Sequence, residues 1–166
     1  MSKVLFVGFK GKNNASGRLA ELISPNHLLL TNSFGGLKKD IDTISEKYDL
    51  AIMFGVDKSL VSTVKLEKSA TMDDKRLYSK LGLIEFAEAL ILADIIPVIS
   101  DEPHRSLCND AYWHMLTRFE GRAVFIHIPT IKHELYCEIT RYEPSYLSYI
   151  PTVSAEYQCL FLTCKK

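Results

Sequence analysis

Residues 96–128 read IPVISDEPHRSLCNDAYWHMLTRFEGRAVFIHI and contain a short apolar run, a longer amphipathic segment and a second apolar run. The two runs, Ile96–Ser100 and Ala123–Ile128, are short and rich in β-branched residues, which predicts strands. Between them, Leu107–Phe119 has apolar residues at helical spacing, which predicts a helix. A strand, a helix and a strand in this order are typical of α/β proteins with a mainly parallel sheet.

The same alternation runs from the N-terminus to about Pro129. Further strands are predicted at Val4–Phe9, His27–Thr31 and Leu50–Val56. Further helices are predicted at Ala15–Ile23, Leu37–Tyr48 and Leu83–Asp94, with Asp40 and Glu85 in first turns, where the helix dipole favours carboxylates. The expected fold class is α/β, with a mainly parallel twisted sheet and helices on both faces.

Two segments do not fit this alternation. Ser62–Thr71 is apolar at Val64 and Leu66 and polar between them, which predicts an additional, half-exposed strand. The segment from His133 to the C-terminus is rich in tyrosine, and its length is compatible with a helix packed on the sheet or with another strand. Both interpretations of this segment stay open.

Length and charge narrow the classes of protein. The chain has 166 residues, of which 47% are hydrophobic and 24% charged, so we expect one domain over residues 1–166. Twenty basic and twenty acidic residues cancel, which argues against nucleic-acid or membrane partners. The first apolar run, Val4–Phe9, is too short for a signal peptide or a membrane span, so we expect a cytoplasmic protein.

Four cysteines are scattered along the chain without a CxxC pair or zinc-type spacing with histidine. They are interpreted as reduced thiols, and no metal or cofactor is expected. The four are Cys108, Cys137, Cys159 and Cys164.

Cys108 and His127 are candidates for a catalytic pair. Cys108 falls in the first turn of a predicted helix, where unpaired amides and the helix dipole lower a thiol pKa. A buried, inert thiol is the commoner case for a cysteine taken alone. His127 interrupts a buried strand near its C-terminal end, where a polar ring needs a partner. The strand end and the helix start face one crevice, so the two side chains can form the pair needed for acyl transfer.

Three segments occur in an order that carries a family resemblance: residues 62–68 (STVKLEK), 100–109 (SDEPHRSLCN) and 125–129 (FIHIP). They resemble the catalytic segments of the pyroglutamyl peptidase I (pyrrolidone-carboxylate peptidase) family of cysteine peptidases. The opening strand and loop are also similar, so the resemblance spans roughly residues 4 to 130. It implies a phosphorylase/hydrolase-like α/β sandwich and a thiol protease that removes N-terminal pyroglutamyl groups.

By this resemblance, Cys108 is the nucleophile, His127 the base, and Glu67 the group that orients His127. Taken alone, a glutamate on a strand such as Glu67 is usually solvated. The family's substrates imply a small acyl-amide or peptide partner, and the family often self-associates, which implies a homo-oligomer.

The resemblance implies a shortened and divergent member of this family. Lys10-Gly11-Lys12 replaces an aromatic Gly-Pro-Phe-Gly turn, and the interval between Glu67 and Cys108 is short and lacks a polar substrate-side hairpin. The acyl group is therefore either pyroglutamyl or another small group. Phe9 and Leu107 are the candidates for an apolar wall.

Lys10 and Lys12 suit an acyl group with a negative charge, although solvated surface is the preferred interpretation. The loop from Lys10 to Asn14 matches neither GxxxxGK[ST] nor GxGxxG, so a plain turn is favoured over a nucleotide site. Two other functions remain open. One is an altered or inactive binding or regulatory module on the same fold, and the other is an amide-forming acyltransferase.

Overall fold

Strands and helices alternate along most of the chain in the computed structural model, which describes residues 3–45, 47–103 and 106–130. The strands are β1 (Val4–Phe9), β2 (His27–Leu30), β3 (Leu50–Val56), β4 (Thr63–Glu67), β5 (Ser69–Met72), β6 (Lys75–Tyr78), β7 (Ile96–Ser100) and β8 (Ala123–Ile128). The helices are α1 (Ala15–Ile23), α2 (Phe34–Asp42), α3 (Leu83–Leu92) and α4 (Leu107–Arg118).

Six of these strands form one sheet in the order β2-β1-β3-β8-β4-β7. The first four of that order pair in parallel, β4 pairs antiparallel with β8, and β7 pairs in parallel with β4. β5 and β6 form a separate antiparallel hairpin. The predicted α/β fold with a mainly parallel sheet is confirmed.

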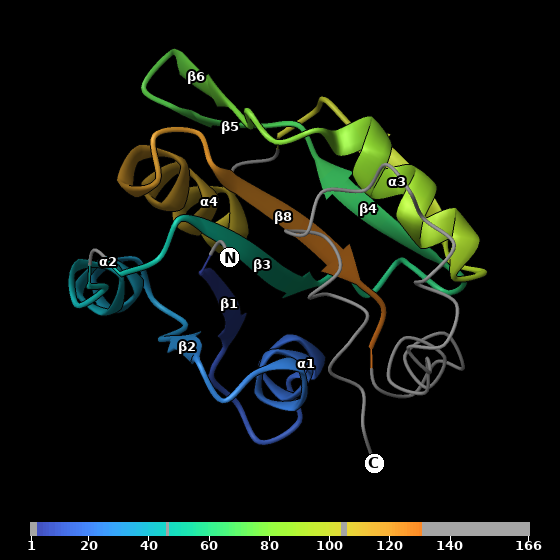
Figure 1. The fold of residues 1–166 in the computed structure, drawn as a ribbon. Coiled ribbons are helices and arrows are strands. Elements are labelled where there is room, and N and C mark those ends of the chain that lie inside the picture. Colours follow the sequence, from blue (N-terminus) through green and yellow to red (C-terminus); the bar gives the residue numbers. More distant parts are fainter. Residues whose placement is uncertain (1–2, 46, 104–105, 131–166) are drawn as a thin grey trace.

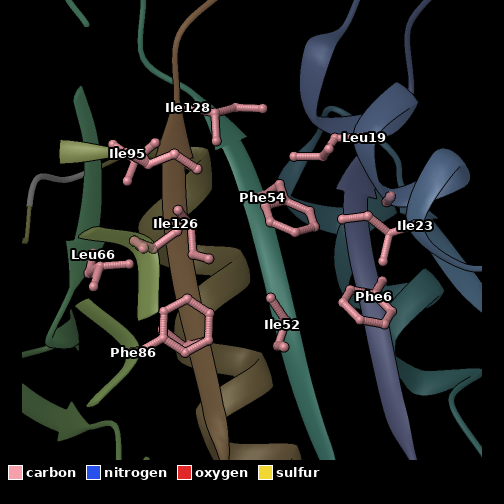
Figure 2. Close-up of a cluster of buried hydrophobic side chains, with 14 of the residues drawn as sticks. Phe6, Leu19, Ile23, Ile52, Phe54, Leu66, Phe86, Ile95, Ile126 and Ile128 are labelled. Carbon is pink, nitrogen blue, oxygen red and sulfur yellow. The ribbon is translucent and has the colours of Figure 1, made fainter. Parts of the chain in front are cut away.

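Helices cover both faces of the sheet, with α1 and α3 on one face and α2 and α4 on the other (Figure 1). The face toward α1 and α3 carries the apolar cluster of Figure 2, in which Ile126 and Ile128 of β8 pack near Phe54 of β3. Alternate residues of a strand point to opposite faces, so Phe125 and His127 face α4. The candidate site therefore lies on the α4 face.

Four strands, β1, β3, β7 and β8, have the predicted bounds. The bounds predicted for the second helix, Leu37–Tyr48, are wrong, because the helix spans Phe34–Asp42. The helix begins at Phe34 because the Ser33 hydroxyl accepts a hydrogen bond from the Gly36 N–H at 3.2 Å and caps it. It ends at Asp42, so Asp40 lies in its last part, where its carboxylate accepts the Thr31 N–H at 2.6 Å. The expected first-turn role of Asp40 is also wrong.

Three other elements end earlier than predicted. β2 ends at Leu30 instead of Thr31. α3 and α4 end at Leu92 and Arg118, and a residue with positive φ follows each of them within two positions. Such residues end a helix because they leave the right-handed region. Glu85 lies in the first turn of α3, as predicted.

The predicted half-exposed strand Ser62–Thr71 is two strands, β4 and β5. β4 lies inside the sheet between β8 and β7, and its burial alternates as predicted over Thr63–Leu66, with Val64 and Leu66 buried and the residues before each of them partly exposed. β5 turns back through Asp73 and Asp74, both with positive φ, into β6. β5 and β6 therefore form a hairpin between Glu67 and Cys108, which the prediction of a single strand over Ser62–Thr71 did not include.

None of the helices in the described ranges has both the length and the hydropathy needed to span a bilayer. The segment from His133 onward, for which a helix and a strand were both open, lies outside the described residues.

Candidate active site

A cavity of about 420 Å³ opens on the α4 face of the sheet. Its walls come from the loop after β3, from β4 and β8, and from the start of α4. Cys108, His127 and Glu67 all line it, so the structure brings the three sequence-predicted side chains to one cavity. The other lining residues are Val56, Asp57, Lys58, Lys65, Ser69, Pro103, Ser106, Asn109, Tyr112 and Phe125.

Cys108 is the second residue of α4, as predicted. Ser106 caps this helix by accepting the Asn109 N–H at 3.2 Å, whereas the N–H groups of Leu107 and Cys108 have no acceptor within the helix. The thiol lies over Gly55 of β3, because a Cβ on that glycine would be 3.2 Å from Sγ. Gly55 is the β3 partner of His127, so the thiol is beside the strand position that carries the ring.

His127 has the partner that a polar ring on a buried strand needs. Its Nε2 lies 3.3 Å from Oε1 of Glu67 across the β8–β4 pair. The ring of Phe125 packs against the imidazole with 4.8 Å between centroids. Nδ1 of His127 and Oε2 of Glu67 are buried and have no hydrogen-bond partner among the described residues. Nδ1 is therefore the ring nitrogen left to exchange a proton.

The lowered thiol pKa expected from the helix start is wrong. Burial, together with the carboxylates of Glu67 and Asp57, raises the pKa of Cys108 to about 11, and the nearby Lys65 only partly offsets them. At neutral pH the thiol is therefore protonated. Any nucleophilic chemistry at Cys108 needs a base that removes the proton during the reaction rather than a preformed thiolate.

Sequence analysis missed Lys65 and Asp57. Nζ of Lys65 lies 3.0 Å from Oδ2 of Asp57 and 3.6 Å from Oε1 of Glu67. Burial acts to raise the pKa of Asp57, but hydrogen bonds from Ser59 and Lys65 leave it well below its usual range. The alternation in β4 was the available signal, since it puts Lys65 on the same face as Glu67.

The four predicted substrate residues do not line this cavity. Phe9 is buried and packs near Phe125, with ring centroids 6.5 Å apart, and Leu107 packs partly buried against the same core. The Lys10 ammonium donates to Thr31 at 2.8 Å and pairs with Asp40 of α2. Lys12 is exposed. An apolar wall from Phe9 and Leu107 and anion binding by Lys10 and Lys12 find no support in this geometry.

In the part of the chain that the structure describes, no group of three or more His, Cys, Asp or Glu side chains is arranged to bind a metal ion. In the loop after β1, Asn14 caps α1 by accepting the Ser16 N–H at 3.0 Å. This loop is a capped turn between a strand and a helix.

Comparisons with known proteins agree with the fold. No family model and no curated protein matches the sequence. Among solved structures, pyrrolidone carboxyl peptidase from the hyperthermophile Pyrococcus furiosus is similar with a TM-score of 0.66 and 20% identity, covering 82% of this chain and 83% of that chain. A mutant of this peptidase gives a TM-score of 0.68 with the same identity and coverage.

The pyrrolidone carboxyl peptidase of Fervidobacterium islandicum AW-1, a thermophilic keratin-degrading bacterium, is also similar. Its TM-score is 0.63 at 18% identity, covering 96% of this chain and 93% of that chain. The chain thus has the fold of the pyrrolidone carboxyl peptidases, and the resemblance inferred from the sequence is confirmed at the level of the fold.

Proposed function

We propose that this protein is a cysteine hydrolase that cleaves the amide bond next to a small N-terminal acyl group, with pyroglutamyl as the first acyl group to test. One observation carries the proposal. Nε2 of His127 pairs with Glu67, whereas Nδ1 is buried and has no partner among the described residues. His127 lines the same cavity as Cys108. The structural neighbours, which are peptidases by name, support the reaction type.

In the proposed reaction, Nδ1 of His127 removes the proton from the Cys108 thiol as sulfur attacks the carbonyl carbon. Glu67 stabilises the imidazolium that forms. The tetrahedral intermediate collapses when the C–N bond breaks, and the imidazolium returns its proton to the leaving amine. Water then gives a proton to Nδ1 and attacks the thioester, which releases the carboxylic acid and restores the thiol.

The oxyanion of the intermediate needs N–H donors. The N–H groups of Leu107 and Cys108 at the start of α4 are free within the helix, and such a donor typically contributes about 3 kcal/mol. In the turn after β3, the N–H groups of Asp57, Ser59 and Leu60 bond within the protein. The N–H of Lys58 is the remaining N–H of this turn, and it has no acceptor among the described residues. We propose this N–H as a further donor to the oxyanion.

The test is a panel of fluorogenic amides in which the acyl group is pyroglutamyl, an acyclic group of similar size, or a group that carries a carboxylate. We expect turnover of at least one amide, a covalent acyl adduct on Cys108 by mass spectrometry, and loss of about a thousandfold in kcat/KM for Cys108→Ser and His127→Gln. His114→Gln is the matched control, because His114 lies on α4, pairs with Asp110 and does not line the cavity. A wild-type protein without turnover or adduct on any amide contradicts the proposal.

The raised pKa of Cys108 favours a second candidate, a binding or regulatory module on the same fold. This candidate predicts that the same acyl amides bind without turnover, which calorimetry on the wild-type protein measures. Transfer to an amine is a third outcome of the panel. It would appear as a new amide product when a second amine is added.

A further inference from the structure

We propose that Lys65 is a positioning residue of this site, in which its ammonium, held between Asp57 and Glu67, fixes the Glu67 carboxylate against His127. The expected effect of Lys65 on turnover rests on the proposed hydrolase function. The expected effect of Lys65 on the reactivity of the Cys108 thiol can be measured without a substrate. The proposed mechanism assigns no step to Lys65.

The first support is a continuous chain of charged contacts. Nζ of Lys65 lies 3.0 Å from Asp57 and 3.6 Å from Oε1 of Glu67, and the same Oε1 lies 3.3 Å from Nε2 of His127. One carboxylate oxygen is thus shared by the ammonium and the ring. With the other oxygen, Oε2, unpartnered among the described residues, these two contacts set the orientation of the carboxylate.

The second support is the strand register. β4 and β8 are antiparallel, and Lys65 lies directly opposite His127, with Glu67 opposite Phe125. The Lys65 side chain is only 20% exposed, although a lysine is normally solvated. A lysine is held in such a position by its partners, and here both partners are carboxylates of the candidate site.

The third support is the charge balance of the cavity. Lys65 and Glu67 face it from β4, Asp57 and Lys58 from the loop after β3, and His127 from β8. From α4 come Cys108 and Tyr112, while the described lining residues of β5 and of the loop after β7 carry no charge: Ser69, Pro103 and Ser106. Lys65 is the cation that contacts both carboxylates. Without it, two negative charges stay close to the thiol.

The electrostatic effect on the thiol has a clear sign. Burial and the two carboxylates raise the pKa of Cys108, and Lys65 acts in the opposite direction. Removing the ammonium therefore makes the thiolate harder to form, and it also frees Glu67 to rotate away from the ring. A lysine with only a structural role would change neither property when its packing is preserved.

The experiment compares Lys65→Met, Lys65→Gln and Lys65→Arg with the wild-type protein. For Lys65→Met we expect kcat on the best acyl amide to fall about tenfold or more while KM changes less than about twofold. We also expect the alkylation rate of Cys108 by iodoacetamide at pH 8 to fall about threefold or more. Lys65→Arg keeps the charge and should restore most of both quantities.

Lys68→Met is the matched control. Lys68 follows Glu67 directly, is also paired, but binds Asp101 outside the cavity at 3.1 Å. Its replacement should leave the alkylation rate of Cys108 unchanged. If Lys65→Met does not fold, as judged by circular dichroism, the comparison of Lys65→Gln with Lys65→Arg takes its place.

The proposal is overturned if neutral variants of Lys65 alkylate at the wild-type rate, or if Lys65→Arg is as impaired as Lys65→Met. These outcomes differ from failure of the hydrolase proposal. In that case the wild-type protein turns over no amide, yet the alkylation rates still respond to the charge at position 65.

Discussion

The side-chain amide of Asn109 pairs with the backbone of Thr71 in both directions. Its Oδ1 accepts the Thr71 N–H at 2.9 Å and its Nδ2 donates to the Thr71 carbonyl at 2.7 Å, as a neighbouring strand would. This pair joins the residue after Cys108 to β5. The hairpin that sequence analysis did not anticipate is therefore bonded to the start of α4.

Asn109→Ala should lower the free energy of unfolding by about 1–3 kcal/mol, because both backbone groups of Thr71 lose their partner. Urea denaturation followed by circular dichroism measures the change. Asn109→Asp keeps the acceptor but sets a carboxylate oxygen against the Thr71 carbonyl, so it should destabilise at least as much as Asn109→Ala. Equal stability of Asn109→Ala and wild type would show that water replaces the pair without cost.

Glu67→Gln should lower kcat about a hundredfold and leave KM nearly unchanged, because an amide cannot stabilise the His127 imidazolium as a carboxylate does. Steady-state kinetics on the best amide of the panel gives both constants. An effect confined to KM would instead make Glu67 a substrate contact. The unpartnered Oε2 would then be the atom that accepts a substrate N–H.

Alkylation of Cys108 should be slow at neutral pH and rise about tenfold for each pH unit up to about pH 10. The reason is that burial and two carboxylates raise the thiol pKa to about 11, so the thiolate fraction keeps growing across this range. Peptide mass spectrometry after timed iodoacetamide treatment measures the rate. A plateau in the rate below pH 9 would contradict this prediction, because it would show that the helix start lowers the thiol pKa more than burial raises it. In urea, where burial is lost, the same thiol should react faster.

Gly55→Ala should destabilise the protein by about 1–3 kcal/mol. An added Cβ would lie 2.6 Å from two ring atoms of the buried Phe125 and 3.2 Å from Sγ of Cys108, so the ring or the thiol must move. Activity should fall together with stability.

Gly35→Ala is the control for that prediction. Gly35 lies in α2 with nothing within 4 Å of an added Cβ, so the same change there should stabilise the helix by up to about 1 kcal/mol. Thermal unfolding of both variants tests the pair. Equal effects would mean that the space over Gly55 does not limit the packing of Phe125.

Three strands, β1, β3 and β8, could be predicted because their residues are buried almost continuously, whereas the apolar run of β7 is largely exposed at the edge of the described sheet. Val4–Phe9 is buried at all six positions, and such a run has one simple interpretation. The position of β4 could not be predicted, since strand order depends on pairing between distant segments. Sequence periodicity alone could not show that Thr63–Glu67 lies between β8 and β7 with reversed direction.

The candidate site was predictable where side chains stand out locally. His127 is a polar residue in an apolar strand, and Cys108 falls in the first turn of a predicted helix, so the sequence identified both as candidates. Lys65 did not, because a lysine alternating with apolar residues is usually solvated. Lys10 was named as a candidate substrate contact because it stands where the family has an aromatic turn, and its pairing with Asp40 depends on a distant segment that sequence periodicity does not reveal.

The antiparallel pairing of β4 with β8 also dictates when the site can form. Glu67 and Lys65 meet His127 only after β8 has inserted between β3 and β4, two strands that come much earlier in the sequence. Contacts of such long sequence separation close late in folding. During synthesis, the chain can therefore fold its first βα units before the candidate site exists, and the thiol of Cys108 can meet His127 only after the ribosome has passed Ile128.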